Sequence, residues 1–106
     1  MSTHPHQPQP ATSLLAMPEI KEAGRLLSAA GFTELPGIRA DARVGFRTIG
    51  AYYDLVILFG DGHMEAIRQT VDEPLWLPGQ DERDDFEWMK SGEPLEVVQE
   101  LLALPN

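Results

Sequence analysis

One group of side chains in this sequence could carry out acid–base chemistry. His63 follows a Gly60-Asp61-Gly62 turn, while Tyr52, Tyr53 and Asp54 begin the apolar segment before it. A histidine beside a carboxylate can transfer protons near neutral pH. The sequence contains no nucleophile elbow and no glycine-rich phosphate loop to complete an enzyme site. These residues therefore indicate, as an alternative function, a small-ligand-binding or catalytic domain. A simpler interpretation is that His63 is only an exposed turn residue.

A second group combines carboxylates with tryptophan near the C-terminus. Residues 72–106 contain 10 acidic and 2 basic residues, a net charge of −8, whereas residues 1–71 contain 7 and 6, a net of −1. Carboxylates accelerate encounter with a basic partner, and tryptophans are frequent anchors of interfaces. We expect a non-enzymatic protein-binding domain of the inhibitor, immunity or adaptor type. Its candidate partner-binding residues are Trp76, Asp81, Glu82, Asp84, Asp85, Glu87 and Trp88. The alternative is a solvated acidic face in which Trp76 and Phe86 cap a small core.

Metal binding is expected only at the N-terminus, and only as an incidental property. The acids around residue 84 lack the alternating ligands and the central glycine of a calcium loop. Removal of Met1 would expose Ser2-Thr3-His4, whose amine, two amides and imidazole can surround Cu(II) or Ni(II) in one plane. No cofactor is expected. Positive charge gathers only at Arg39, Arg43, Arg47 and Arg68, where pairing with nearby acids is expected in preference to a phosphate-binding face.

Composition limits the class of protein. The chain has 106 residues, a net charge of −9, 42% hydrophobic residues and no cysteine. We expect a disordered tail rich in Pro, Gln and His over residues 1–17, followed by a single domain over 18–106. The acidic balance disfavours nucleic-acid binding, and no apolar run is long enough to span a membrane. A cytoplasmic protein is expected, and the excess of Arg over Lys suggests a bacterial source.

Hydrophobic periodicity then predicts the elements that position these residues. An α+β fold is expected, in which helices cover one face of a three-stranded antiparallel meander as a two-layer sandwich. The 63–71 strand, more polar than the others, is expected at the sheet edge, with a helix as its alternative. A homodimer through that edge is a third functional alternative. The predicted elements are a helix over 18–30, strands near 43–48, 52–59 and 63–71, a short helix over about 81–90, and a final helix from Pro94 in which Leu95, Val98, Leu101 and Leu102 face the core.

Overall fold

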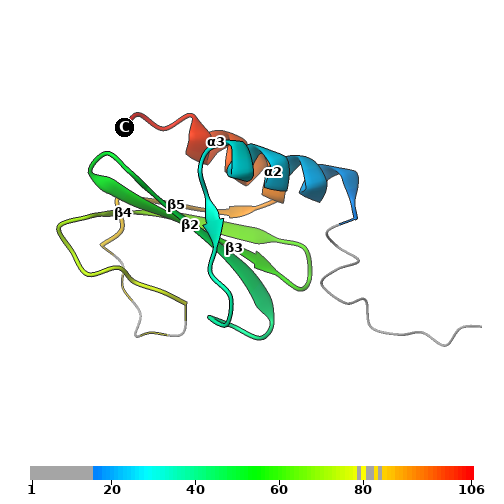
Figure 1. Cartoon of the computed structure of the whole chain (residues 1–106), viewed down its shortest axis with the longest axis horizontal. Helices are drawn as coiled ribbons and strands as arrows, with labels where there is room; N and C mark the ends of the chain where they lie inside the picture. Colours follow the sequence, from blue (N-terminus) through cyan, green and yellow to red (C-terminus); the bar gives the residue numbers. More distant parts are fainter. Residues whose placement is uncertain (1–15, 79, 81–82, 84) are drawn as a thin grey trace, which may run out of the picture.

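The computed structural model describes residues 16–78, 80, 83 and 85–106. It is an α+β protein, as the sequence predicts, in which two helices accompany an antiparallel sheet (Figure 1). The elements are α2 (Pro18–Ala29), β1 (Thr33–Glu34), β2 (Ala42–Ile49), β3 (Tyr52–Phe59), β4 (Met64–Thr70), β5 (Trp88–Gly92) and α3 (Pro94–Leu102).

The sheet has five strands where three were expected, and each strand pairs with its neighbours in the chain. The predicted strands are present as β2, β3 and β4, so a strand and not a helix follows the 60–62 turn. The expectation that this strand lies at the edge is wrong, because β5 pairs with its outer side. Its polar residues Arg68 and Gln69 are buried and hydrogen-bonded to specific partners. Because these residues are polar, the sequence pattern predicts an edge strand although β4 lies inside the sheet.

The short helix predicted over about 81–90 is also wrong within the described residues. Trp88–Gly92 is a strand, and the described residues between Arg83 and Glu87 are not helical. Residues 81, 82 and 84 lie outside the described part of the chain. Pairing with the open side of β4 gives this segment a hydrogen-bonded ladder, and that long-range gain outweighs the local preference on which the prediction rested.

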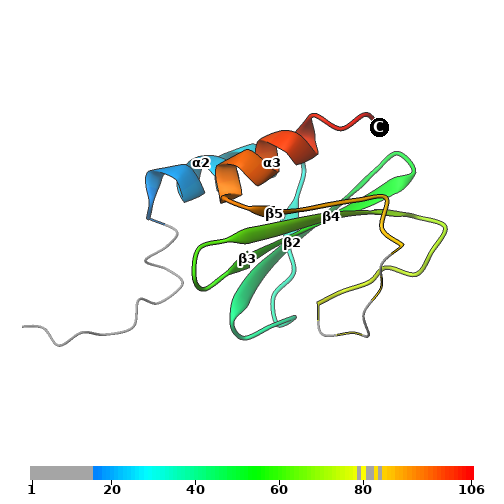
Figure 2. The ribbon, with the colours of Figure 1, turned by 180° about the vertical axis from the view of Figure 1, so that it is seen from behind.

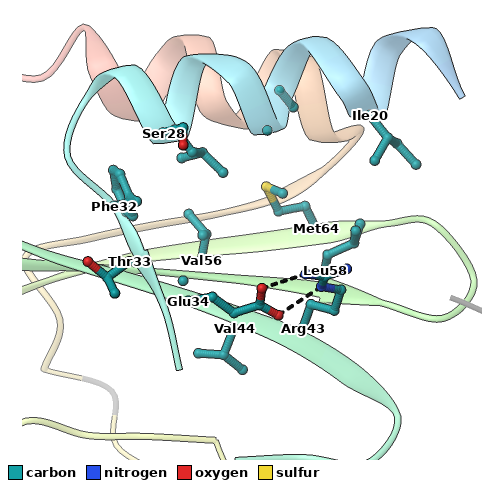
Figure 3. A pocket seen from close by; sticks show the side chains of 14 residues that line it. Ile20, Ser28, Phe32, Thr33, Glu34, Arg43, Val44, Val56, Leu58 and Met64 are labelled. Atoms are coloured by element: carbon teal, nitrogen blue, oxygen red, sulfur yellow. Dashed lines mark hydrogen bonds and ion pairs between the residues drawn. The ribbon is translucent and has the colours of Figure 1, made fainter. Parts of the chain in front are cut away.

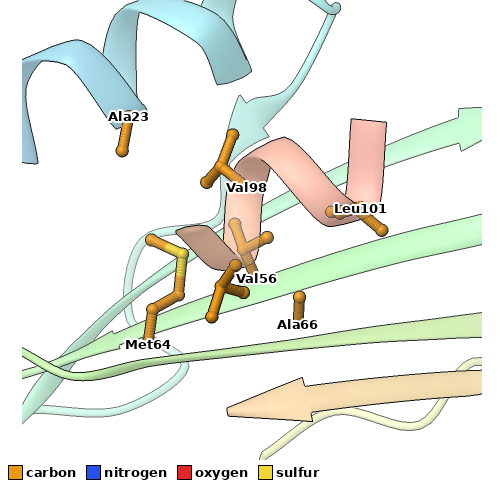
Figure 4. Close-up of a cluster of buried hydrophobic side chains, with 7 residues drawn as sticks. Ala23, Val56, Met64, Ala66, Val98 and Leu101 are labelled. Carbon is orange, nitrogen blue, oxygen red and sulfur yellow. The ribbon is translucent and has the colours of Figure 1, made fainter. Parts of the chain in front are cut away.

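Both helices lie on the same side of the sheet (Figures 1 and 2). α2 packs chiefly against α3, and α3 in turn packs against β4 and β5. Beneath α2 a groove remains open over the sheet (Figure 3). The core between the helices and the sheet contains Ala23, Val56, Met64, Ala66, Val97, Val98 and Leu101, all buried (Figure 4).

The helix α3 presents a slightly different face from the one predicted. Pro94, Val97, Val98 and Leu101 are buried, whereas Leu95 is only partly buried. Leu102 packs against the edge of the same core. A second cluster forms on the opposite face of the sheet, where loop residues pack over Val44, Leu55 and Ile57. The run Leu55–Ile57 is therefore buried on both faces, as expected of a central strand. No helix in the described residues is long and apolar enough to cross a membrane.

Candidate functional site

Carboxylates concentrate along α3 and β5. Every acidic residue that the structure describes beyond position 71 is exposed: Asp72, Glu73, Asp85, Glu87, Glu93, Glu96 and Glu100. Glu87 immediately precedes β5, and Glu93 connects β5 to α3. Because α3 packs against β5, the acids of the helix lie beside the same strand. The predicted acids Asp81, Glu82 and Asp84 lie outside the described residues.

The two bases of this region are already engaged. Lys90 Nζ lies 2.8 Å from Glu100 Oε2 and 3.7 Å from Glu96 Oε1. The hydrogen bond to Glu100 is the main cause that raises the pKa of Lys90. Arg83 donates through Nε to Asp85 at 3.0 Å, and this contact lowers the pKa of that carboxyl.

Four acids of the region remain without a basic partner among the described residues: Asp72, Glu73, Glu87 and Glu93. Local ion pairs therefore neutralise the bases and leave a surplus of exposed negative charge.

The two tryptophans lie on opposite faces of the sheet. Trp88 faces Arg68 across β4 and β5 and packs against the cluster beneath the helices. Trp76 packs against the cluster on the other face, where its ring meets Phe86 edge-on with the centroids 5.5 Å apart. The structure thus does not bring the two rings into one surface.

Gln69 fixes the position of the segment that carries Trp76. Its side-chain Oε1 accepts a hydrogen bond from the Trp76 main-chain N–H at 2.8 Å, and its Nε2 donates to the Trp76 carbonyl at 3.1 Å. One buried amide therefore satisfies both main-chain groups of the loop residue. This contact attaches the loop after β4 to the sheet, and the sequence gives no local signal for it.

The residues proposed for acid–base chemistry are also separated. Asp54 lies near the start of β3 whereas His63 follows its far end, about 17 Å away along the strand. His63 instead contacts Asp61, with Nδ1 2.5 Å from Oδ1, and stacks on Phe59. Tyr52 and Tyr53, as consecutive strand residues, point to opposite faces. The four side chains form no common site.

Asp54 has a different environment from the one that the sequence suggested. It is fully buried, and its carboxylate accepts hydrogen bonds from Arg47 Nε at 2.9 Å and Arg68 Nε at 2.8 Å. The guanidinium groups also donate to the carbonyls of Ala30 and Pro105. The hydrogen bond with Asp54 is the main cause that raises the pKa of Arg68. Pairing of the arginines with nearby acids is confirmed here, and again at Arg39 with Asp41 and Arg43 with Glu34.

A groove lies under α2, with a volume of about 320 Å³ (Figure 3). Ile20, Ala23 and Leu27 line it from the helix, while Val56, Leu58 and Met64 line it from the sheet. The ion pair between Arg43 and Glu34 lies at its side. Sequence reasoning missed this groove, because it depends on how α2 lies relative to the sheet.

The described residues contain no group of three or more His, Asp or Glu side chains that could hold a metal ion. His4, the expected copper or nickel ligand, lies outside the described part of the chain. Comparison with family models, curated proteins and solved structures finds no match for this chain.

Proposed function

We propose that this protein is a non-enzymatic protein-binding domain that receives a basic partner on its acidic C-terminal third. The supporting observation is the surplus of exposed carboxylates around β5 and α3, where both local bases are already paired. Such a surface attracts Lys and Arg side chains of a partner and repels nucleic acid. The function is of the inhibitor, immunity or adaptor type, in a cytoplasmic protein.

The separation of the two tryptophans divides the candidate residues. One group lies on or beside β5 and α3 and contains Trp88, Glu87 and the acids of α3. We place the principal contact with the partner there. Trp76 and Asp85 belong to the loop after β4, together with Asp81, Glu82 and Asp84 in sequence. We propose that the charge of this loop accelerates association with the same partner and contributes little affinity.

The test compares two charge-reversed proteins. In Glu87→Lys with Glu93→Lys, two unpaired acids of the proposed surface change sign. In the control, Glu19→Lys with Glu22→Lys, the same change of charge is made on α2, at the exposed Glu19 and at the partly exposed Glu22, which pairs with Arg25. Each protein is immobilised and exposed to host lysate, and proteins eluted with salt are identified by mass spectrometry. We expect one basic protein to be enriched by the wild type and by the control and to be lost from the first variant.

The purified partner then gives a quantitative measurement. Its association rate constant should fall at least about tenfold between about 0.02 and 0.5 M NaCl, because salt screens attraction between exposed charges. Equal retention by the two charge-reversed proteins would exclude the β5–α3 surface as the binding site.

Small-ligand binding is a second candidate, which the groove under α2 supports. Its volume of about 320 Å³ and its mainly apolar lining suit a small aliphatic or aromatic molecule. Gly24 lines the groove, and a Cβ built there has no heavy atom within 4 Å. A leucine at this position can therefore occupy open space and also favours the helix.

The probe for this candidate is 8-anilinonaphthalene-1-sulfonate, followed by its fluorescence. Gly24→Leu should abolish binding to the groove, whereas Ala29→Leu, at an exposed position of α2 outside the groove, should leave it unchanged. Absence of binding by the folded wild type, or equal binding by both variants, would remove this candidate.

A further inference from the structure

The strand β5 forms one edge of the sheet. It pairs with β4 along Trp88–Gly92, and the structure describes no strand on its other side. In an antiparallel sheet, alternate main-chain N–H and C=O groups of an edge strand point outward, where another extended chain can pair with them. At the opposite edge of the sheet, β1 pairs with the middle of β2 and so covers that part of its outer side.

The usual protection of an edge strand is weak in β5. The segment contains no proline, and its lysine is held by Glu96 and Glu100 of α3. Met89 is 53% exposed, the highest value among the large hydrophobic side chains of the described residues. An accessible main chain beside an exposed apolar side chain is a surface on which an added strand can bury area.

The charges around β5 decide which kind of chain can pair with it. Glu87 and Glu93 lie at its two ends, and the acids of α3 lie beside it on the helix side. Two copies of this protein joined through β5 would bring these carboxylates together. Like charges brought together across a strand pair destabilise it, so the surroundings oppose self-pairing and favour a basic segment.

We propose that β5 binds its partner by strand addition, as the edge on which an extended basic segment of the partner pairs. This inference rests on the proposed function and adds the mode of recognition. Alternation along a strand sets the pattern of that segment. Lys or Arg side chains lie on the side of Trp88 and α3, within reach of the carboxylates, and apolar side chains lie on the side of Met89.

The probe is a capped seven-residue peptide with Lys at odd positions and Val at even positions. Two further forms carry N-methyl groups on alternate amides, with the side chains and charges unchanged. In one form the methylated amides lie along one edge of the extended peptide, and in the other form they lie along the opposite edge. Binding to the full chain is measured by isothermal titration calorimetry at low salt. Hydrogen exchange of the β5 amides is followed by NMR with and without the unmodified peptide.

We expect the unmodified peptide to bind and to slow exchange in β5. One methylated form should bind at least about tenfold more weakly, and the other should be nearly unaffected, because only one edge of an added strand faces β5. Glu87→Lys with Glu93→Lys should weaken all three peptides, while Glu19→Lys with Glu22→Lys should not.

The contrary outcomes separate the two proposals. Equal binding of the three peptides, or unchanged exchange in β5, would overturn strand addition while leaving the acidic surface as a charge-based binding site. Absence of binding by any of the peptides would overturn strand addition as well. A dimer in sedimentation equilibrium whose β5 amides are protected without peptide would show that a second copy occupies the edge. The proposed function itself is contradicted only if Glu87→Lys with Glu93→Lys retains the captured partner as well as the control variant does.

Discussion

Asp54 and Arg68 face each other directly across β3 and β4, and the carboxylate accepts two hydrogen bonds from the guanidinium, at 2.8 and 3.0 Å. Arg47 approaches the same carboxylate from β2, its partner in register on the other side of Asp54. Three charged side chains thus form one buried row across three strands. Through the carbonyls of Ala30 and Pro105, the row also holds the end of α2 and the C-terminal segment against the sheet.

Replacement of Asp54 by Asn should be strongly destabilising. The change leaves two buried guanidinium groups without a counter-charge, and loss of one partner from a buried ion pair costs about 3–5 kcal/mol. Urea unfolding followed by circular dichroism measures the difference. The control is Asp41→Asn at the exposed pair with Arg39, where we expect a loss of about 0–1 kcal/mol. Equal losses in the two variants would show that the buried row does not stabilise the fold more than a surface pair.

Replacement of Gln69 by Ala should release the loop that carries Trp76. The change leaves the Trp76 main-chain N–H and carbonyl without their side-chain partner, at a cost of about 1–3 kcal/mol. In a Trp88→Phe background Trp76 is the sole tryptophan, so its emission reports the loop directly. We expect a shift to longer wavelength under native conditions. Gln99→Ala, on the exposed side of α3, is the matched control and should leave the spectrum unchanged.

Truncation of Leu101 should test the core beneath the helices. Leu101 is fully buried, and removal of a buried leucine side chain to alanine leaves a cavity that costs about 2–5 kcal/mol. Thermal and urea unfolding measure the loss. The same truncation at Leu95, which is only partly buried, should cost less. A larger loss at Leu95 than at Leu101 would contradict the observed orientation of α3.

The contribution of the Asp61 carboxyl to the free energy of unfolding should depend on pH. It accepts hydrogen bonds from the main-chain N–H and the ring of His63, and these lower its pKa below the usual 3.8. A lowered folded-state pKa means that this contribution is complete above pH 3.8 and is lost as the pH falls through the folded value. The difference in unfolding free energy between wild type and Asp61→Asn should therefore be larger at about pH 6 than at about pH 3. A difference that is independent of pH would contradict this assignment.

Periodicity and turn residues were sufficient to predict the elements whose signals are local. The 18–30 helix agrees with α2 to within a residue at its C-terminal end, and the 52–59 strand agrees with β3. Gly31 and Gly62, with φ of 92° and 94°, occupy the backbone region that favours glycine. Gly31 lies just after the end of the 18–30 helix, and Gly62 lies in the turn that the sequence indicates before His63. These features depend on a few neighbouring residues, so a single sequence contains them.

The sequence could not indicate the relationships that depend on register. Asp54 is 7 residues from Arg47 and 14 from Arg68, and nothing in that spacing distinguishes a buried row from three solvated charges. The local pattern predicts a helix up to about residue 90, but segment 88–92 becomes a strand because β4 offers an unpaired side.

The sequence by itself determined that a surplus of negative charge lies in the last third of the chain, because charge is a property of composition. Only the tertiary structure decided that Trp76 and Trp88 lie on opposite faces of the sheet, and that the surplus borders an open strand edge. Those outcomes follow from strand pairing and from packing between segments far apart in the chain. The energies of strand pairing and of long-range packing arise only when the whole fold forms. The pattern of neighbouring residues in the sequence therefore does not reveal them.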